Sequence, residues 1–435
     1  MTVSRGSLVV AAAVPLLFLH AHFQPGVSIA VGGTTVNAYL SDFALLAVLV
    51  VALGVLAREG FAPLRAGVPL WIAAAAFFVW LGFELEWGRH RVSSYPLGTH
   101  AVTALKFLEY ALLAPALALL LRGARDVLVV LWSLVLWSCA ATLVGIAEFF
   151  GAHVASRGAV GHRQASFLSD ADFAALSAAV LLVGVVAVGA PSLRIPRSLG
   201  RIALATGALG TIVAGAAASV FGLATALVAL VVVLLARREI SPGRVVSVSA
   251  VAAFVAAGVV TIRINDLEAF AGFLGASSRH ERPAAKVQTY AHHTLLAWIG
   301  YEMWKDHPLL GVGWEGSAEP ANFERYLPAA HRRFPNEAPL AFPAAAPNRR
   351  YGVQNVWLQA LADLGVIGCA LWAAVFAVAT WLAVRARATL PGLLALVWTG
   401  LLVWLWSAQG FVAGIPLDAL TWLAFGFAST RLRPA

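Results

Sequence analysis

Several basic side chains have the chemistry to bind phosphate. The candidates are His162, Arg163, Arg279, His280, Arg282, Arg349 and Arg350. Arginine is always charged, and its planar fork of N–H donors suits phosphate oxygens. Two or three converging arginines would therefore bind a pyrophosphate. The alternative for any single arginine is an ion pair with Glu281, Glu302 or Glu315, or a contact with lipid headgroups.

A pair of amides begins a second candidate site. Gln354 and Asn355 stand at the start of an apolar stretch, and Asn355 and Gln359 are four residues apart, so they share one face of a helix. Amides at the mouth of a membrane span can hydrogen-bond sugar hydroxyls. The alternative is ordinary helix capping, with close packing at the small residues Gly365 and Gly368.

Motifs of other catalytic classes are absent from the sequence. It contains no P-loop, dinucleotide fingerprint, G-x-S-x-G motif or metal-spaced cluster of His and Cys. The adjacent His292 and His293 point to different faces of a helix, which argues against a chelating pair. We therefore expect neither metal nor cofactor. Without a nucleotide-binding motif, any group transfer must use an energy-rich donor that is already in the membrane.

The composition indicates the elements that must position these residues. Of 435 residues, 60% are hydrophobic and 12% are charged, against roughly 25% charged in soluble proteins. This excludes a soluble enzyme and a disordered chain. The net charge of +9 comes largely from arginines in short loops, so it does not indicate a nucleic-acid partner.

Apolar stretches long enough to span a bilayer number about 12. The expected spans are 7–23, 38–57, 66–84, 99–121, 126–150, 171–190, 201–217, 219–236, 246–262, 364–384, 391–409 and 411–430. The fold class is thus an all-α polytopic membrane protein. Arginines of the short loops fall on the same side as Arg5, which the positive-inside rule makes cytoplasmic, so we expect both termini inside.

The spans divide the chain into three parts. Residues 1–262 form spans one to nine, 263–354 form one large external loop, and 355–435 form spans ten to twelve. The loop contains a predicted helix over 284–306, with apolar residues at helical spacing. His307-Pro308 should end this helix, because the residue before proline disfavours the helical region.

Charges inside the predicted spans are few. Lys106 and Glu109 are three residues apart and are expected to pair, while Asp42, Glu148 and Asp418 lie near span ends. An ion-coupled transporter would place acids at mid-membrane. The scarcity of such acids makes a flippase or transporter the weaker alternative, and a scaffold protein is weaker still.

The motifs resemble the O-antigen ligase and polymerase superfamily. A helix with tryptophans leads into Pro308-Leu309-Leu310-Gly311-Val312-Gly313, as in that family's large loop. Nine residues separate Gln354-Asn355 from Gly365-Val366-Ile367-Gly368, which keeps the family spacing. An arginine shortly before the loop helix is also typical, and Arg279 or Arg282 fits it. The segment from His162 to Phe167 is similar to the family's other arginine site.

This resemblance implies a GT-C-like glycosyltransferase in the bacterial cytoplasmic membrane. Its donor would be a polyprenyl-pyrophosphate-linked glycan, its acceptor a glycan or glycolipid, and its reaction a metal-independent displacement at the anomeric carbon. The resemblance assigns the diphosphate leaving group to Arg163, Arg279 and Arg282. It leaves ligase and polymerase activity equally open.

One position departs from the family pattern. Ligases have a His where Gln354 stands, and that His is thought to help activate the acceptor hydroxyl. An amide cannot act as a general base, so Gln354 and Asn355 are expected to orient the acceptor. The base would then be His280, His292 or Glu281.

Overall fold

The structure is a computed structural model that describes residues 3–31, 34–155, 163–239, 241–274, 289–335, 352–412 and 414–432. Within these ranges, eight helices are long and apolar enough to cross a membrane. The other four expected spans overlap the helices α1, α8, α16 and α17. The mostly helical chain agrees with the predicted all-α polytopic class, and the figure of 12 spans stays a prediction.

The elements up to residue 155 form one half of the bundle. They are α1 (Arg5–Leu17), β1 (Gly26–Val31), β2 (Thr34–Tyr39), α2 (Leu40–Glu59), α3 (Val68–Arg91), α4 (Leu97–Ala111), α5 (Leu113–Leu120) and α6 (Ala124–Phe149). Short 3₁₀ turns, η1 (Ala21–Phe23) and η2 (Ala62–Gly67), precede β1 and α3. The β1–β2 hairpin is antiparallel and pairs Gly26 with Tyr39; it is absent from the elements that we predict.

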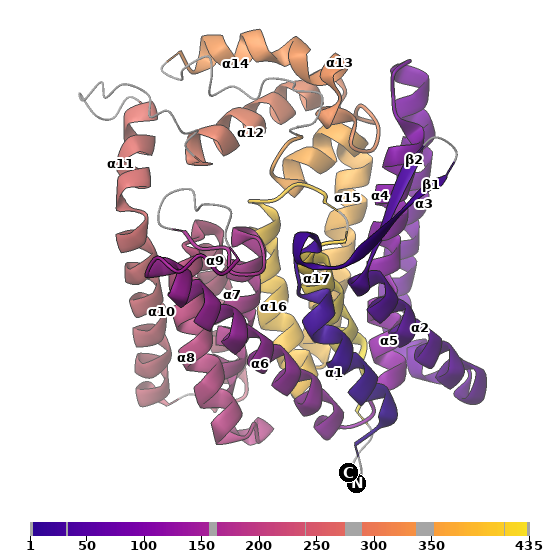
Figure 1. Cartoon of the computed structure of the whole chain (residues 1–435). Helices are drawn as coiled ribbons and strands as arrows, with labels where there is room; N and C mark the ends of the chain where they lie inside the picture. The colour runs from indigo at the N-terminus through magenta and orange to yellow at the C-terminus, as the bar shows by residue number, and fades with distance from the viewer. Residues whose placement is uncertain are drawn as a thin grey trace.

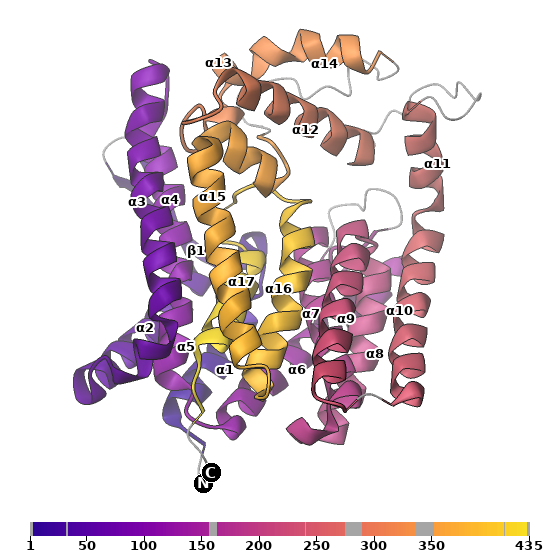
Figure 2. The same cartoon turned by 180° about the vertical axis from the view of Figure 1, so that it is seen from behind.

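The remaining elements complete the bundle and cover one end of it. They are α7 (Asp170–Gly189), η3 (Pro191–Leu193), α8 (Arg197–Ala214), α9 (Ala217–Ala236), α10 (Pro242–Ile262), α11 (Ile264–Phe273), α12 (Thr289–Asp306), η4 (Gly316–Ala318), α13 (Pro320–Phe323), η5 (Glu324–Tyr326), α14 (Leu327–Arg333), α15 (Val356–Arg385), α16 (Leu390–Trp406) and α17 (Pro416–Ser429). In Figures 1 and 2, α12, α13 and α14 lie across one end of the bundle, and both marked chain ends lie at the other.

The helix predicted over 284–306 ends where the sequence indicates. α12 runs to Asp306, and the His307 N–H still donates to the Met303 carbonyl oxygen at 3.0 Å before Pro308. Residues 284–288 lie outside the described ranges. The apolar side of α12 joins Phe323, Tyr326 and Val353 in a small hydrophobic cluster of its own, separate from the main core. This end of the molecule is therefore held by its own core as well as by the bundle.

Two details of the first half add to or correct the sequence prediction. The expected span 99–121 is found as one candidate span, Leu97–Leu120, with a break in the helix at Leu112 between α4 and α5. Pro115 explains the break, because it lacks an N–H and its ring clashes with the carbonyl four residues earlier. Lys106 pairs with Asp42, at 2.7 Å, rather than with Glu109.

Helices α7 and α8 are packed closely together through small residues. A Cβ at Gly207 would collide with the backbone of Leu181, and one at Gly184 would lie 2.6 Å from the Leu204 nitrogen. Small residues allow such close approach in membranes. At the adjoining ends of the two helices, the Gln164 N–H donates to the Val213 carbonyl oxygen at 3.2 Å. The residues just before α7 are thereby fixed against the end of α8.

The glycine-rich turn after α12 packs into a kink of α15. Gly365 has φ +66°, which breaks the helix, and a Cβ there would collide with the Leu309 carbonyl. Backbone hydrogen bonds join the two segments: Gly313 N–H donates to Asp363 O at 2.9 Å, and Val366 N–H donates to Pro308 O at 2.9 Å. The two glycine motifs of the sequence, at 311–313 and 365–368, thus pack directly against each other.

Replacing Gly365 with alanine should destabilise the protein. A non-glycine residue at this positive φ costs about 1–3 kcal/mol, and the collision with Leu309 adds to that cost. The thermal midpoint in detergent should fall clearly. The matched control is Gly54→Ala in α2, where a Cβ meets nothing within 4 Å and alanine favours the helix. Equal midpoints for the two variants would contradict this role of Gly365.

Candidate active site

Two arginines from distant parts of the sequence pack against one turn. Arg163 precedes α7, and Arg263 joins α10 to α11. Between them lies Gly215, at the turn from α8 to α9, in the left-handed conformation with φ +61°. A Cβ at Gly215 would lie 3.2 Å from Arg163 Cγ and 3.6 Å from Arg263 Cδ. The two side chains therefore pack against the same point of the backbone.

Each guanidinium has a carboxylate partner, but the arginines are far more buried than their partners. Arg163 Nη1 lies 2.9 Å from Asp170 Oδ2, and Arg263 Nε lies 3.0 Å from Asp266 Oδ2. The Arg263 side chain is 2% exposed, whereas Asp266 is 31% exposed. Within the described residues, the buried Nη1 of Arg263 has no hydrogen-bond partner. A buried donor without an acceptor costs free energy, so this atom marks a place for a ligand oxygen.

Helix α12 covers the arginine pair. The Arg263 guanidinium carbon lies 4.8 Å from the centre of the Tyr290 ring, a cation–π contact. His293 follows three residues later on the same helical face, and its Nδ1 lies 3.2 Å from the Gln354 carbonyl oxygen. We call Arg163, Arg263, Tyr290, His293 and Gln354 the arginine site.

The arginine site is buried and positively charged, and this lowers the pKa values of its basic groups. Burial lowers the pKa of the Arg163 guanidinium; Asp170 opposes this, and the charge of Arg263 lowers it further. Burial likewise lowers the pKa of His293, and both arginines add to that effect. A ligand anion would relieve the repulsion between the two cations, because opposite charge favours their charged forms.

Comparison with known proteins relates part of this chain to a family of membrane enzymes. Residues 202–373 match the O-antigen ligase family. This supports the O-antigen ligase and polymerase superfamily that the motifs predict, and that family implies a glycosyltransferase-like membrane enzyme whose substrate is a lipid-linked glycan. A comparison with curated proteins found no match.

The ligase-family segment contains most of the arginine site, but not all of it. Arg263, Tyr290, His293 and Gln354 lie within residues 202–373, whereas Arg163 lies outside them. Sequence reasoning predicts Arg163 and Gln354 and misses the other three. For Arg263 a signal existed: it is a lone arginine between isoleucines, at the outer end of a predicted span.

The amide motif of the ligase-family segment proves largely structural. Asn355 caps α15, its Oδ1 accepting from the Leu358 N–H at 3.1 Å. Gln359 is buried, with Nε2 donating to Asp363 at 2.9 Å and Oε1 accepting from the Phe411 N–H at 2.6 Å. The prediction that Gln359 shares a sugar-binding face with Asn355 is therefore wrong. The capping alternative is confirmed, and a role of Asn355 in holding the acceptor stays a prediction.

The other predicted site residues cannot be placed. Those outside the described residues are His162, Arg279, His280, Glu281, Arg282, Arg349 and Arg350. Their roles stay predictions. His292 is described and belongs to α12, and its pKa is lowered, to about 4, by burial and by its neighbour His293.

A second buried cluster of the ligase-family segment fixes the glycine-rich turn to α4. His100 Nδ1 lies 2.9 Å from Glu315 Oε2, and its Nε2 lies 2.9 Å from Glu319 Oε1. Both ring nitrogens donate only in the imidazolium form, so a buried cation joins two carboxylates. On the other side of the turn, the Ser317 N–H donates to Asp363 Oδ1 at 2.7 Å. This cluster holds the start of α15 in place.

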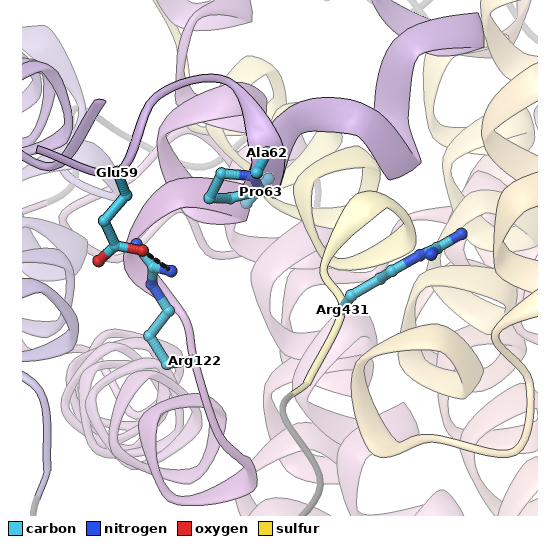
Figure 3. A pocket seen from close by; sticks show the side chains of 6 residues that line it. Glu59, Ala62, Pro63, Arg122 and Arg431 are labelled. Carbon is cyan, nitrogen blue, oxygen red and sulfur yellow. Dashed lines mark hydrogen bonds and ion pairs between the residues drawn. The ribbon is translucent and has the colours of Figure 1, made fainter. Parts of the chain in front are cut away.

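A cavity elsewhere in the molecule lacks the converging arginines that a diphosphate site needs. It has a volume of about 220 Å³ and is lined by Glu59, Ala62, Pro63, Ala118, Arg122 and Arg431. Figure 3 shows Arg122 facing Glu59, at 2.7 Å, and Arg431 pointing away from that pair. Its arginines do not converge. Among the described residues, no group of His, Cys, Asp and Glu could hold a metal ion.

Proposed function

We propose that this protein transfers a glycan from a polyprenyl-pyrophosphate donor to a glycan or glycolipid acceptor, as an O-antigen ligase-like glycosyltransferase. The proposal rests on one observation: the buried Nη1 of Arg263 has no acceptor among the residues that the structure describes, and it stands beside a second buried arginine. The match of residues 202–373 to the O-antigen ligase family supports it.

The arginine site suits a diphosphate leaving group. As the bond from the anomeric carbon to the diphosphate oxygen breaks, negative charge develops on that oxygen. Preorganised donors stabilise such charge most strongly where water is excluded, and Arg263 is almost fully buried. Asp170 and Asp266 are partly exposed, so water can solvate them when phosphate oxygens take their place on the guanidinium groups.

The remaining sequence predictions fit this proposal without being tested by it. Arg279 and Arg282, with His280, would add to the diphosphate site, and Arg349 and Arg350 would bind more distant parts of the substrate. Residues 263–354 would form an external region of a bacterial cytoplasmic membrane protein with both termini inside. A lipid-linked donor would then be used on the outer face, where α12 covers the arginine site.

Reconstitution tests the proposal directly. Purified protein would be mixed with a polyprenyl-pyrophosphate oligosaccharide, with and without an acceptor glycolipid, and the products would be separated on a gel. We expect a single shifted band that requires the acceptor. A ladder from the donor alone would show a polymerase instead. Movement of the donor across vesicle membranes without any product would contradict glycan transfer and favour the transporter alternative.

A further inference from the structure

His293 holds its proton on a defined nitrogen. A carbonyl oxygen can only accept a hydrogen bond, so the Nδ1 of His293, 3.2 Å from Gln354 O, must be the nitrogen that carries hydrogen. In the neutral ring, Nε2 is then the acceptor. Among the described residues, no hydrogen bond to this Nε2 is formed. The hydrogen bond to Gln354 O thus holds the His293 ring in the form whose Nε2 lone pair can accept a proton.

The position of His293 on α12 directs it toward the arginine pair. Tyr290 lies against the guanidinium of Arg263, and residues three apart share one face of a helix. The neighbouring His292 has its ring perpendicular to that of His293. The positive charges of Arg163 and Arg263 act on His293, which places its ring close to the arginine pair.

The charges around His293 keep it neutral. Burial lowers its pKa, and the positive charges of Arg163 and Arg263, from the segments before α7 and after α10, lower it further. The hydrogen bond to the Gln354 carbonyl oxygen and the charge of Asp170 oppose this lowering of the pKa, and on α12 itself His292 is the neighbouring titratable ring. A neutral imidazole is the form that can accept a proton at neutral pH.

Other groups at the arginine site are less suited to take a proton. The carboxylates of Asp170 and Asp266 are engaged by Arg163 and Arg263. The side chain of Gln354 is an amide, which has no basic atom at neutral pH. The imidazole of His293 lies beside the backbone of position 354 and is the neutral basic group at the arginine site.

We propose that His293 is the catalytic base that removes the proton of the acceptor hydroxyl, an inference that rests on the proposed function. The acceptor oxygen forms the new bond to the anomeric carbon as its proton passes to Nε2. The bond from that carbon to the diphosphate oxygen breaks, and its electron pair leaves with the diphosphate beside Arg263. The imidazolium then returns the proton to solvent or to the released diphosphate.

The test uses a variant that keeps the hydrogen bond and lacks the base. His293→Asn retains an N–H donor near the position of Nδ1 and has no equivalent of Nε2. In the reconstituted transfer assay, its kcat should fall by about 10²–10⁴-fold. The control, His90→Asn, changes an exposed histidine at the end of α3 and should stay near wild type. Thermal midpoints of both variants in detergent establish that they fold.

A relocated base and a pH profile complete the test. In His293→Asn combined with Gln354→His, transfer should recover much of the lost rate. The wild-type rate should fall at acid pH, as the base is protonated, and the residual rate of His293→Asn should lack this decline. Wild-type transfer by His293→Asn would overturn the role of His293 while the proposed function stands. Absence of transfer by the wild-type protein, with any donor, would overturn both.

Discussion

Replacing Arg263 with methionine should reduce glycan transfer by about 10²–10³-fold, the loss expected when one preorganised donor to a developing oxyanion is removed. Methionine fills much of the same space but cannot donate to a diphosphate oxygen. The loss should appear mainly in kcat, because the charge develops in the transition state. Initial rates with the polyprenyl-pyrophosphate donor over a range of donor concentrations measure it.

Two further variants test whether that loss comes from the donor geometry of Arg263 and from its position. Arg263→Lys keeps the charge but not the planar fork, so it should retain more activity than Arg263→Met and less than wild type. Arg325→Ala is the matched control, since Arg325 also lies near α12 but is 66% exposed and is 3.5 Å from Asp306. If Arg263→Met transferred glycan at the rate of Arg325→Ala, the arginine site would not be the diphosphate site.

Replacing His100 with leucine should destabilise the protein by about 3–5 kcal/mol, because it leaves the carboxylates of Glu315 and Glu319 without their buried partner. The Glu319 side chain is 3% exposed and cannot turn to water without moving the glycine-rich turn. A shift of the unfolding transition in detergent measures this loss. His90→Leu, an exposed histidine at the end of α3, is the control and should change stability little.

Neutralising Glu315 and Glu319 in the His100→Leu variant should restore much of the lost stability. The triple variant His100→Leu, Glu315→Gln and Glu319→Gln buries no net charge at this place, and neutral groups cost far less to bury. It should therefore unfold at a higher temperature than His100→Leu alone. A triple variant less stable than the single variant would show that His100 contributes through packing rather than through charge.

Local sequence patterns predicted the helices well. Apolar spacing and His307-Pro308 placed the end of α12, and apolar length located the spans, because both depend on neighbours within one helix. The break at Leu112 was also readable in principle, since Pro115 follows it by three residues. The exposed hairpin was missed because its short strands bury no apolar face that a pattern could reveal.

The site was harder to predict because its residues meet only in three dimensions. Sequence reasoning proposed Arg279 and Arg282 because the family has an arginine shortly before its loop helix, whereas Arg163 and Arg263 are brought together by the packing of α7, α8 and α10. It named His292 and not His293 among the candidate bases, because which of two adjacent residues faces a site depends on how α12 is rotated about its axis. Gln359 was misjudged for a related reason: its partners, Asp363 and Phe411, come from two different segments.

The arginine site spans the boundary of the segment that matches the ligase family, and this has a consequence for protein engineering. A chimera that received residues 202–373 from another protein would exchange Arg263 but keep Arg163. Both side chains pack against Gly215, so neither can be exchanged without regard to the other. The smallest transplantable unit of this chain therefore begins before α7, at the cation that precedes Asp170, and not where the family likeness begins.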